Sequence, residues 1–128
     1  MKRASEPRVD RLLSFLPLFD QRGYSYGEWH RPAGQVPYFM VSEDVSRFVQ
    51  VLHDDGWVAS FDWSKWQPRA EALYRDNGAL GRARLSTLRR LLTVHVRKDR
   101  FCEGHLAGML AEGHIVAILR RIAELRAA

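Results

Sequence analysis

The sequence contains a single cysteine, Cys102, and no long hydrophobic run. One cysteine excludes an internal disulfide and a zinc site built from several cysteines. No apolar stretch approaches the roughly 20 residues that a membrane-spanning helix needs. The first residues, 1–7, are basic but lead into no signal-peptide apolar core. These absences predict a cytoplasmic protein with no membrane partner.

The composition is that of an ordinary globular protein. The chain has 128 residues, of which 46% are hydrophobic and 27% are charged, as in a typical single domain. A chain of this length buries roughly two thirds of its unfolded surface, which is enough for a hydrophobic core without disulfides or metals. We therefore predict a single domain over residues 1–128, with a flexible N-terminal tail at 1–8.

Charged and aromatic residues are unevenly distributed along the chain. Residues 1–81 hold 10 Lys and Arg against 11 Asp and Glu, whereas residues 82–128 hold 10 against 4. Thirteen of the 14 aromatic residues lie before residue 75. This pattern predicts an aromatic-rich first part that packs on a basic helical second part, and a basic surface attracts anionic partners.

Hydrophobic spacing predicts a mostly helical chain, with Pro17 kinking or ending the first helix near Leu16. Ser42, Ser64 and Ser86 are expected to cap three of the helices. Aromatic and β-branched runs at 23–29 and 36–41 predict a β-hairpin, and 57–61 is a candidate third strand. The predicted fold class is α+β, a predominantly α-helical single domain with a small antiparallel β-sheet of two or three strands. Helices are expected at about 9–20, 43–55, 64–75, 86–100, 104–112 and 114–126, with a loop around 77–81.

The helix predicted at 86–100 carries four arginines within an arc of about 100°. They are Arg89, Arg90, Arg97 and Arg100. One interpretation is a solvated cationic face. The other is an anion-binding surface, because the planar guanidinium fork matches phosphate oxygens. We favour a non-catalytic binding module for a nucleic acid or an acidic protein, without sequence-specific readout, since no known nucleic-acid motif accompanies the arginines.

His95 and Asp99 lie four residues apart on the apolar side of the same predicted helix, where a charge is costly unless it is paired. In the structural interpretation, Asp99 accepts a hydrogen bond from His95 or caps the next helix. In the functional one, these groups belong to a site for acid–base chemistry, together with Glu103 and His105.

Two interpretations are also possible for the tryptophans. Trp57, Trp63 and Trp66 are expected in the core, with Asp62 capping the following helix. The alternative is an aromatic pocket for a flat or cationic ligand. The alternative function is therefore a small enzyme or ligand-binding domain, with a site formed by Trp57, Asp62, Trp63, Trp66, Asp99, Glu103 and His105.

No cofactor and no metal are predicted, because Cys102 and His105 alone do not supply the ligands of a zinc site. The sequence also has no glycine-rich phosphate loop and no recognised catalytic motif. These observations favour a protein that is not an enzyme and leave an enzyme as the alternative.

Several short motifs are distributed along almost the whole chain. They are Gly27-Glu28-Trp29, Pro37-Tyr38, Gly56-Trp57, Phe61-Asp62-Trp63 with Trp66, and the run from Arg97 to Leu106 that contains DRFCEGHL. The set resembles an uncharacterised bacterial family, one of the catalogued domains of unknown function. The resemblance implies a small stand-alone bacterial protein and brings no activity, cofactor or substrate with it.

Overall fold

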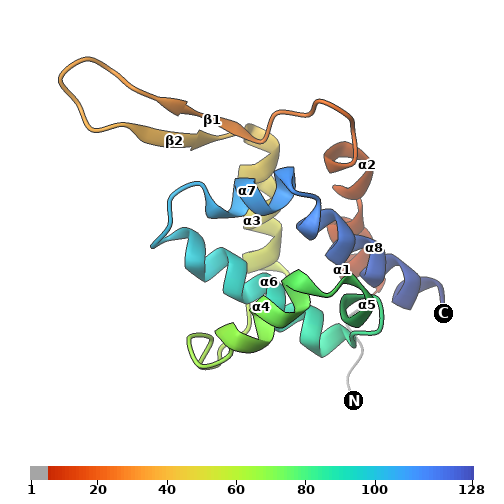
Figure 1. Ribbon diagram of the computed structural model, residues 1–128. Coiled ribbons are helices and arrows are strands. Elements are labelled where there is room, and N and C mark those ends of the chain that lie inside the picture. The colour runs from red at the N-terminus through yellow and green to blue at the C-terminus, as the bar shows by residue number, and fades with distance from the viewer. Residues whose placement is uncertain (1–5) are drawn as a thin grey trace.

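The computed structural model describes residues 6–128 and shows a bundle of helices with one two-stranded antiparallel sheet (Figure 1). The predicted α+β class is therefore confirmed. Residues 1–5 of the predicted tail lie outside the described residues, and residues 6–8 form the start of the first helix. In chain order the elements are α1 (Glu6–Leu13), α2 (Leu16–Phe19), β1 (Gly27–His30), β2 (Tyr38–Val41), α3 (Glu43–Asp54), α4 (Gln67–Arg75), α5 (Asn77–Leu80), α6 (Leu85–Asp99), α7 (His105–Ala111) and α8 (His114–Ala127).

One hydrophobic core holds the helices together. α8 packs against α1, α6 and α7, and α1 also packs against α3. The aromatic rings of Phe15, Phe19 and Phe48 meet at centroid distances of 5.2–5.6 Å, in edge-on and stacked arrangements. The largest fully buried side chains are Leu12, Phe19, Phe48, Leu52, Leu73, Leu88, Leu91, Leu92, Leu106, Leu110, Ile115 and Ile118.

Proline and helix caps explain most of the helix boundaries. The predicted helix at 9–20 is divided into α1 and α2, and Pro17 lies in the first turn of α2, where its missing N–H costs nothing. Ser42 caps α3 as predicted, accepting a hydrogen bond from the N–H of Val45 at 3.3 Å. Asp76 caps α5, a short helix in the region predicted as a loop.

Two predicted serine caps are wrong. α6 begins at Leu85 after Arg84, so Ser86 lies inside the helix. α4 begins at Gln67, and the Ser64 hydroxyl instead donates to Asp62 at 2.8 Å. Pro68 explains the later start of α4, because its fixed φ suits the first turn of a helix and it needs no N–H acceptor there.

The third strand predicted at 57–61 is not formed. The N–H of Ala59 donates to the hydroxyl of Thr93 at 2.8 Å, and this hydroxyl lies 3.3 Å from the carbonyl of Trp57. The N–H of Ala59, which would pair in a sheet, is thus bonded to a side chain of α6, while the hydroxyl itself has the carbonyl of Arg89 as its nearer acceptor at 2.8 Å. Thr93 is fully buried under this segment, so α6 is covered between Arg90 and Arg97, two of the four arginines of the predicted arc.

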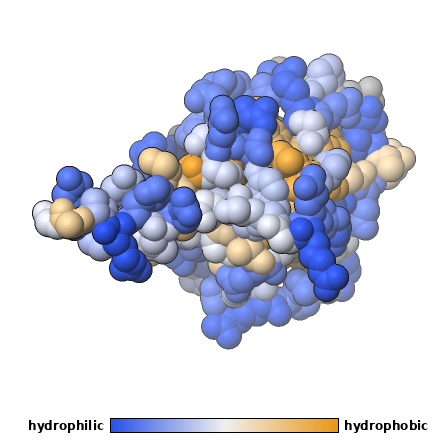
Figure 2. Space-filling view, turned by 90° about the horizontal axis from the view of Figure 1, so that it is seen from above, coloured by the Kyte–Doolittle hydropathy of each residue, from blue (hydrophilic) through white to orange (hydrophobic). Residues whose placement is uncertain are grey.

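The hairpin of β1 and β2 extends away from the helical body (Figure 1), and Figure 2 shows it standing out beside a mostly hydrophilic surface. Trp29 pairs with Phe39 across the strands, and their rings meet at 5.5 Å. Within β2, the N–H of Phe39 donates to the carboxylate of Glu103 at 2.6 Å. This bond ties the hairpin to the turn between α6 and α7.

Candidate functional site

A shallow groove lies between the segment at 59–63 and the C-terminal end of α6. Its volume is about 300 Å³, and no acidic side chain lines it. We call it the arginine–aromatic groove, and its lining residues are Ala59, Ser60, Phe61, Trp63, Arg97, Arg100 and Phe101.

Phe101 is the most unusual residue of this groove. Its side chain is 76% exposed, although large aromatic residues are usually buried. Its ring stacks on that of Trp63, with centroids 6.0 Å apart and planes inclined by 26°. The backbone N–H of Phe101 donates to the carbonyl of Lys98 at 3.0 Å, so the ring is carried by an ordered turn. The groove therefore presents an aromatic surface to solvent.

The four predicted arginines divide into two groups. Arg97 and Arg100 line the groove and form no ion pair within residues 6–128. The guanidinium of Arg90 lies 5.3 Å from the ring centre of Phe61, another lining residue. Arg89 is different, because its Nε donates to the carbonyl of Gly56 at 2.7 Å. Two of the four arginines thus line the groove, and Arg90 contacts the ring of one lining residue. Arg89 instead binds the backbone at Gly56, three residues before the segment that borders the groove.

The structure does not assemble the predicted tryptophan pocket around one cavity. Trp57 is 3% exposed and belongs to the core. Trp66 packs edge-on against Phe61 at 6.0 Å. Asp62 is exposed, accepts a hydrogen bond from Ser64 and lies 3.8 Å from the ammonium of Lys65. Only Trp63 lines the groove.

The two predicted carboxylates of the α6–α7 turn bind backbone amides. Asp99 accepts from the N–H of Leu106 at 2.9 Å, which is one of the two roles predicted for it. Glu103 accepts from Phe39 in the hairpin. His95 bonds to His105 instead of Asp99. Asp99 and Glu103 therefore hold the turn that carries Phe101.

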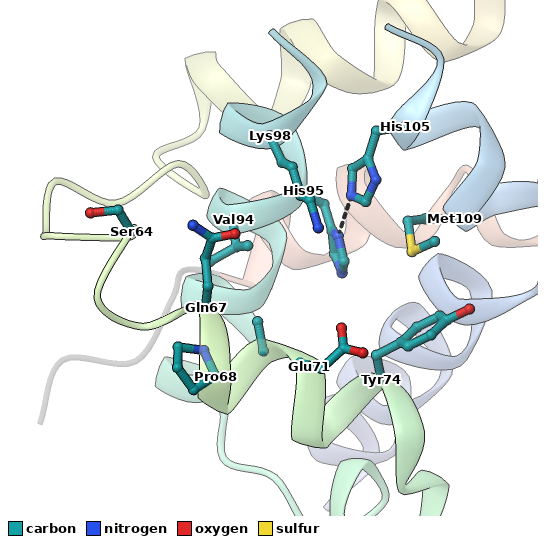
Figure 3. Close-up of a pocket in the computed structure, with 11 residues that line it drawn as sticks. Ser64, Gln67, Pro68, Glu71, Tyr74, Val94, His95, Lys98, His105 and Met109 are labelled. Atoms are coloured by element: carbon teal, nitrogen blue, oxygen red, sulfur yellow. Dashed lines mark hydrogen bonds between the residues drawn. The ribbon is translucent and has the colours of Figure 1, made fainter. Parts of the chain in front are cut away.

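A larger cleft, of about 650 Å³, separates α4 from α6 and α7 (Figure 3). His95 and Lys98 of α6 and His105 of α7 face Glu71 and Tyr74 of α4 across it. We call it the histidine cleft. It is lined by Ser64, Gln67, Pro68, Ala70, Glu71, Tyr74, Val94, His95, Lys98, His105 and Met109.

Three histidines from successive helices meet beside this cleft. Nδ1 of His95 lies 3.0 Å from Nε2 of His105, within hydrogen-bond distance. The ring of His114 stands edge-on to His95 at 5.0 Å and to Tyr74 at 5.1 Å. Nε2 of His95 and both ring nitrogens of His114 are buried and have no hydrogen-bond partner. His95 and His105 were candidates from the sequence, whereas His114, directly after Gly113, has no local signal.

Burial keeps these imidazoles uncharged at neutral pH. Desolvation lowers the pKa of His95 well below its usual 6.5, and the nearby His114, His105 and Lys98 lower it further. Desolvation also lowers the pKa of His114 to about 4. The pKa of His105 is lowered by partial burial and by the charge of Lys98. The cleft therefore offers neutral ring nitrogens beside a cationic lysine.

Within residues 6–128, no three His, Cys, Asp or Glu side chains are grouped so that they could hold a metal ion. None of the helices in this range combines the length and apolarity needed to cross a bilayer. Cys102 is an exposed free cysteine.

The sequence matches the family of unknown function DUF6508 over residues 4–128, so the chain belongs to this family. The predicted resemblance to a domain family of unknown function is confirmed at this level. No curated protein and no solved structure matches the chain.

Proposed function

We propose that this member of the DUF6508 family binds single-stranded nucleic acid through the arginine–aromatic groove. The observation that carries the proposal is the exposed stack of Phe101 on Trp63 beside Arg97 and Arg100, two arginines without a carboxylate partner in the described part of the chain. This surface combines the two contacts that unpaired nucleotides make with proteins.

The first contact is base stacking. A base that is not paired in a duplex offers a flat face, and stacking on an aromatic side chain contributes about 1–3 kcal/mol per base. The ring of Phe101 lies beside that of Trp63, and the residue as a whole is 76% exposed. A base added to this ring would continue the stack.

The second contact is made with phosphates. Arginine binds phosphate oxygens in a bidentate manner, and each neutralised phosphate releases counterions, which favours binding at low salt. Arg97 and Arg100 lie next to Phe101, and no acidic side chain lines the groove to compete for them. The net positive charge of residues 82–128 adds long-range attraction for a polyanion.

The geometry favours a single strand over a duplex. α7, which follows the arginine-bearing helix, has seven residues and is buried at Leu106, Ala107 and Leu110, so it offers no exposed helix face for a major groove. The stacking surface requires an unpaired base. Every base has a flat face that can stack on an aromatic ring, so we expect the protein to bind different sequences with similar affinity.

Fluorescence anisotropy with a labelled oligothymidylate, titrated at several salt concentrations, tests this proposal. We expect Phe101→Ala to weaken binding by about tenfold or more, the effect of one lost stacking contact. Arg97→Ala with Arg100→Ala should weaken it and reduce the salt slope by about 0.7 per lost phosphate contact.

The matched control replaces two exposed arginines outside the groove, Arg69→Ala with Arg82→Ala, which removes the same charge. If both double variants lose the same affinity for the oligonucleotide, net charge alone explains the loss. That result would overturn the groove as the binding site. Absence of binding by the wild type at low salt would overturn the proposal. Polyglutamate that binds as tightly as the oligonucleotide would identify an acidic protein as the partner class instead.

A further inference from the structure

We infer that the histidine cleft is a second site, independent of the groove, that binds a small hydroxycarboxylate. The carboxylate would meet the ammonium of Lys98, and the hydroxyl would meet Nε2 of His95. The inference stands on three features of the cleft: an unpartnered buried nitrogen, an unpaired lysine, and a volume suited to a small molecule.

The unpartnered nitrogen belongs to His95, a residue that is only 5% exposed. Its Nδ1 is engaged with His105, while Nε2 lies on the far side of the ring, toward α4 in Figure 3. Buried polar atoms nearly always have a partner, because one that loses water without replacement destabilises the fold. A ligand group in the cleft would supply this partner.

A hydroxyl can satisfy this nitrogen in either tautomer of the histidine pair. In the neutral His95–His105 pair, one ring donates the shared hydrogen and the other accepts it. Nε2 of His95 is therefore an acceptor in one tautomer and a donor in the other. A hydroxyl can donate or accept, so it satisfies either state, whereas an ammonium group can only donate.

Lys98 supplies the attraction for an anion. It is half-buried, lines the cleft from the same helix as His95, and forms no ion pair with any residue in the range 6–128. The charge of Lys98 lowers the pKa values of both His95 and His105. Glu71 stands on the opposite wall, held by Arg75 at 2.7 Å, and would repel a carboxylate toward Lys98. The two charges thus orient the ligand.

The remaining walls leave room for the carbon skeleton of a small molecule. The volume of about 650 Å³ lies within the usual range of small-molecule sites. Pro68, Val94 and Met109 offer apolar contacts. The hydroxyl of Tyr74 is already bonded to Glu112, so this residue contributes its ring.

The test is a side-chain ¹H–¹⁵N NMR titration of the histidine-labelled full chain with lactate and mandelate as probes. Each has a matched acid without the hydroxyl, namely propionate and phenylacetate. We expect lactate or mandelate to shift the ring nitrogens of His95 and His105 at millimolar concentration. The matched acids should bind about tenfold more weakly, the effect of one hydrogen bond.

Lys98→Met should also weaken binding by about tenfold, because it removes the charge and keeps most of the side-chain volume. The matched control is Lys65→Met, since Lys65 is exposed and does not line the cleft. Absence of a shift with both hydroxy acids in the wild-type protein would overturn the inference. So would equal binding of propionate and lactate, tighter binding of alanine than of lactate, or an equal loss in the Lys65→Met control.

Discussion

Asp99, at the end of α6, accepts a hydrogen bond from the backbone N–H of Leu106, in the first turn of α7, at 2.9 Å. The residue before α7 is Gly104, which has no side chain to cap the helix. The first amides of a helix lack internal acceptors, so Asp99 performs the capping role from the preceding helix. It thereby links the end of α6 to the first turn of α7, across the turn that carries Phe101.

Asp99→Ala should destabilise the protein by about 1–3 kcal/mol, because the amide of Leu106 loses its acceptor in a partly buried position. Urea denaturation measures the change. Asp62→Ala provides the comparison, since Asp62 is exposed and pairs only with its neighbours Ser64 and Lys65. Equal stability of Asp99→Ala and the wild type would show that the cap contributes nothing.

Thr93→Val should cost about 1–3 kcal/mol as well, although valine has the same shape. The substitution leaves the N–H of Ala59 without its acceptor and removes the hydroxyl that lies 2.8 Å from the carbonyl of Arg89 and 3.3 Å from that of Trp57. Because this segment leads to Phe61 and Trp63, oligonucleotide binding should weaken together with stability. Thermal melting and anisotropy measure the two effects, with Thr87→Val on the same helix as the control. Unchanged melting of Thr93→Val would contradict this account.

Acid should destabilise the protein through His114. Its pKa is about 4 in the folded state, against an ordinary value of 6.5 in the unfolded chain. Between these values the unfolded state binds more protons, so stability rises with pH through this window and is lost as pH falls through it. The full effect is roughly 3 kcal/mol. Urea titrations at a series of pH values, with His114→Phe beside the wild type, should show a flatter profile for the variant. A wild-type profile that is already flat from pH 4 to 6.5 would refute the prediction.

Cys102→Ser should change stability by no more than about 0.5 kcal/mol, because Cys102 is exposed and surface substitutions have small effects. Its binding of the oligonucleotide should equal that of the wild type. A folded Cys102→Ser protein that no longer binds would assign the thiol a role in the groove.

Local signals accounted for much of the fold. Ser42 precedes a clear apolar helical pattern, and Pro17 restricts its own backbone, so the boundaries near both residues followed from neighbouring residues alone. Ser86 shows the limit of such signals. A serine near a helix start is also tolerated inside the first turn, and α6 begins before it.

Contacts between distant segments could not be predicted in the same way. Thr93 is a polar residue between Arg90 and Arg97, yet it is buried, and the N–H of Ala59, 34 residues earlier, bonds to its hydroxyl. Nothing near His114 in the sequence indicates its contact with His95, which depends on how α6 and α8 cross. The candidate arginines were predictable from helical phase, whereas their separation into two groups depends on the covering segment.

The hairpin at Gly27–His30 and Tyr38–Val41 is a two-stranded ribbon with no further strand on either side among the described residues. Such a ribbon is only marginally stable alone, and the bond between Phe39 and Glu103 ties it to the helical body. Glu103 belongs to the same turn as Phe101. Fraying of the ribbon and loosening of this turn are therefore parts of one local opening event. Loss of the Phe39–Glu103 bond would therefore remove one of the two carboxylate contacts that hold the turn carrying Phe101.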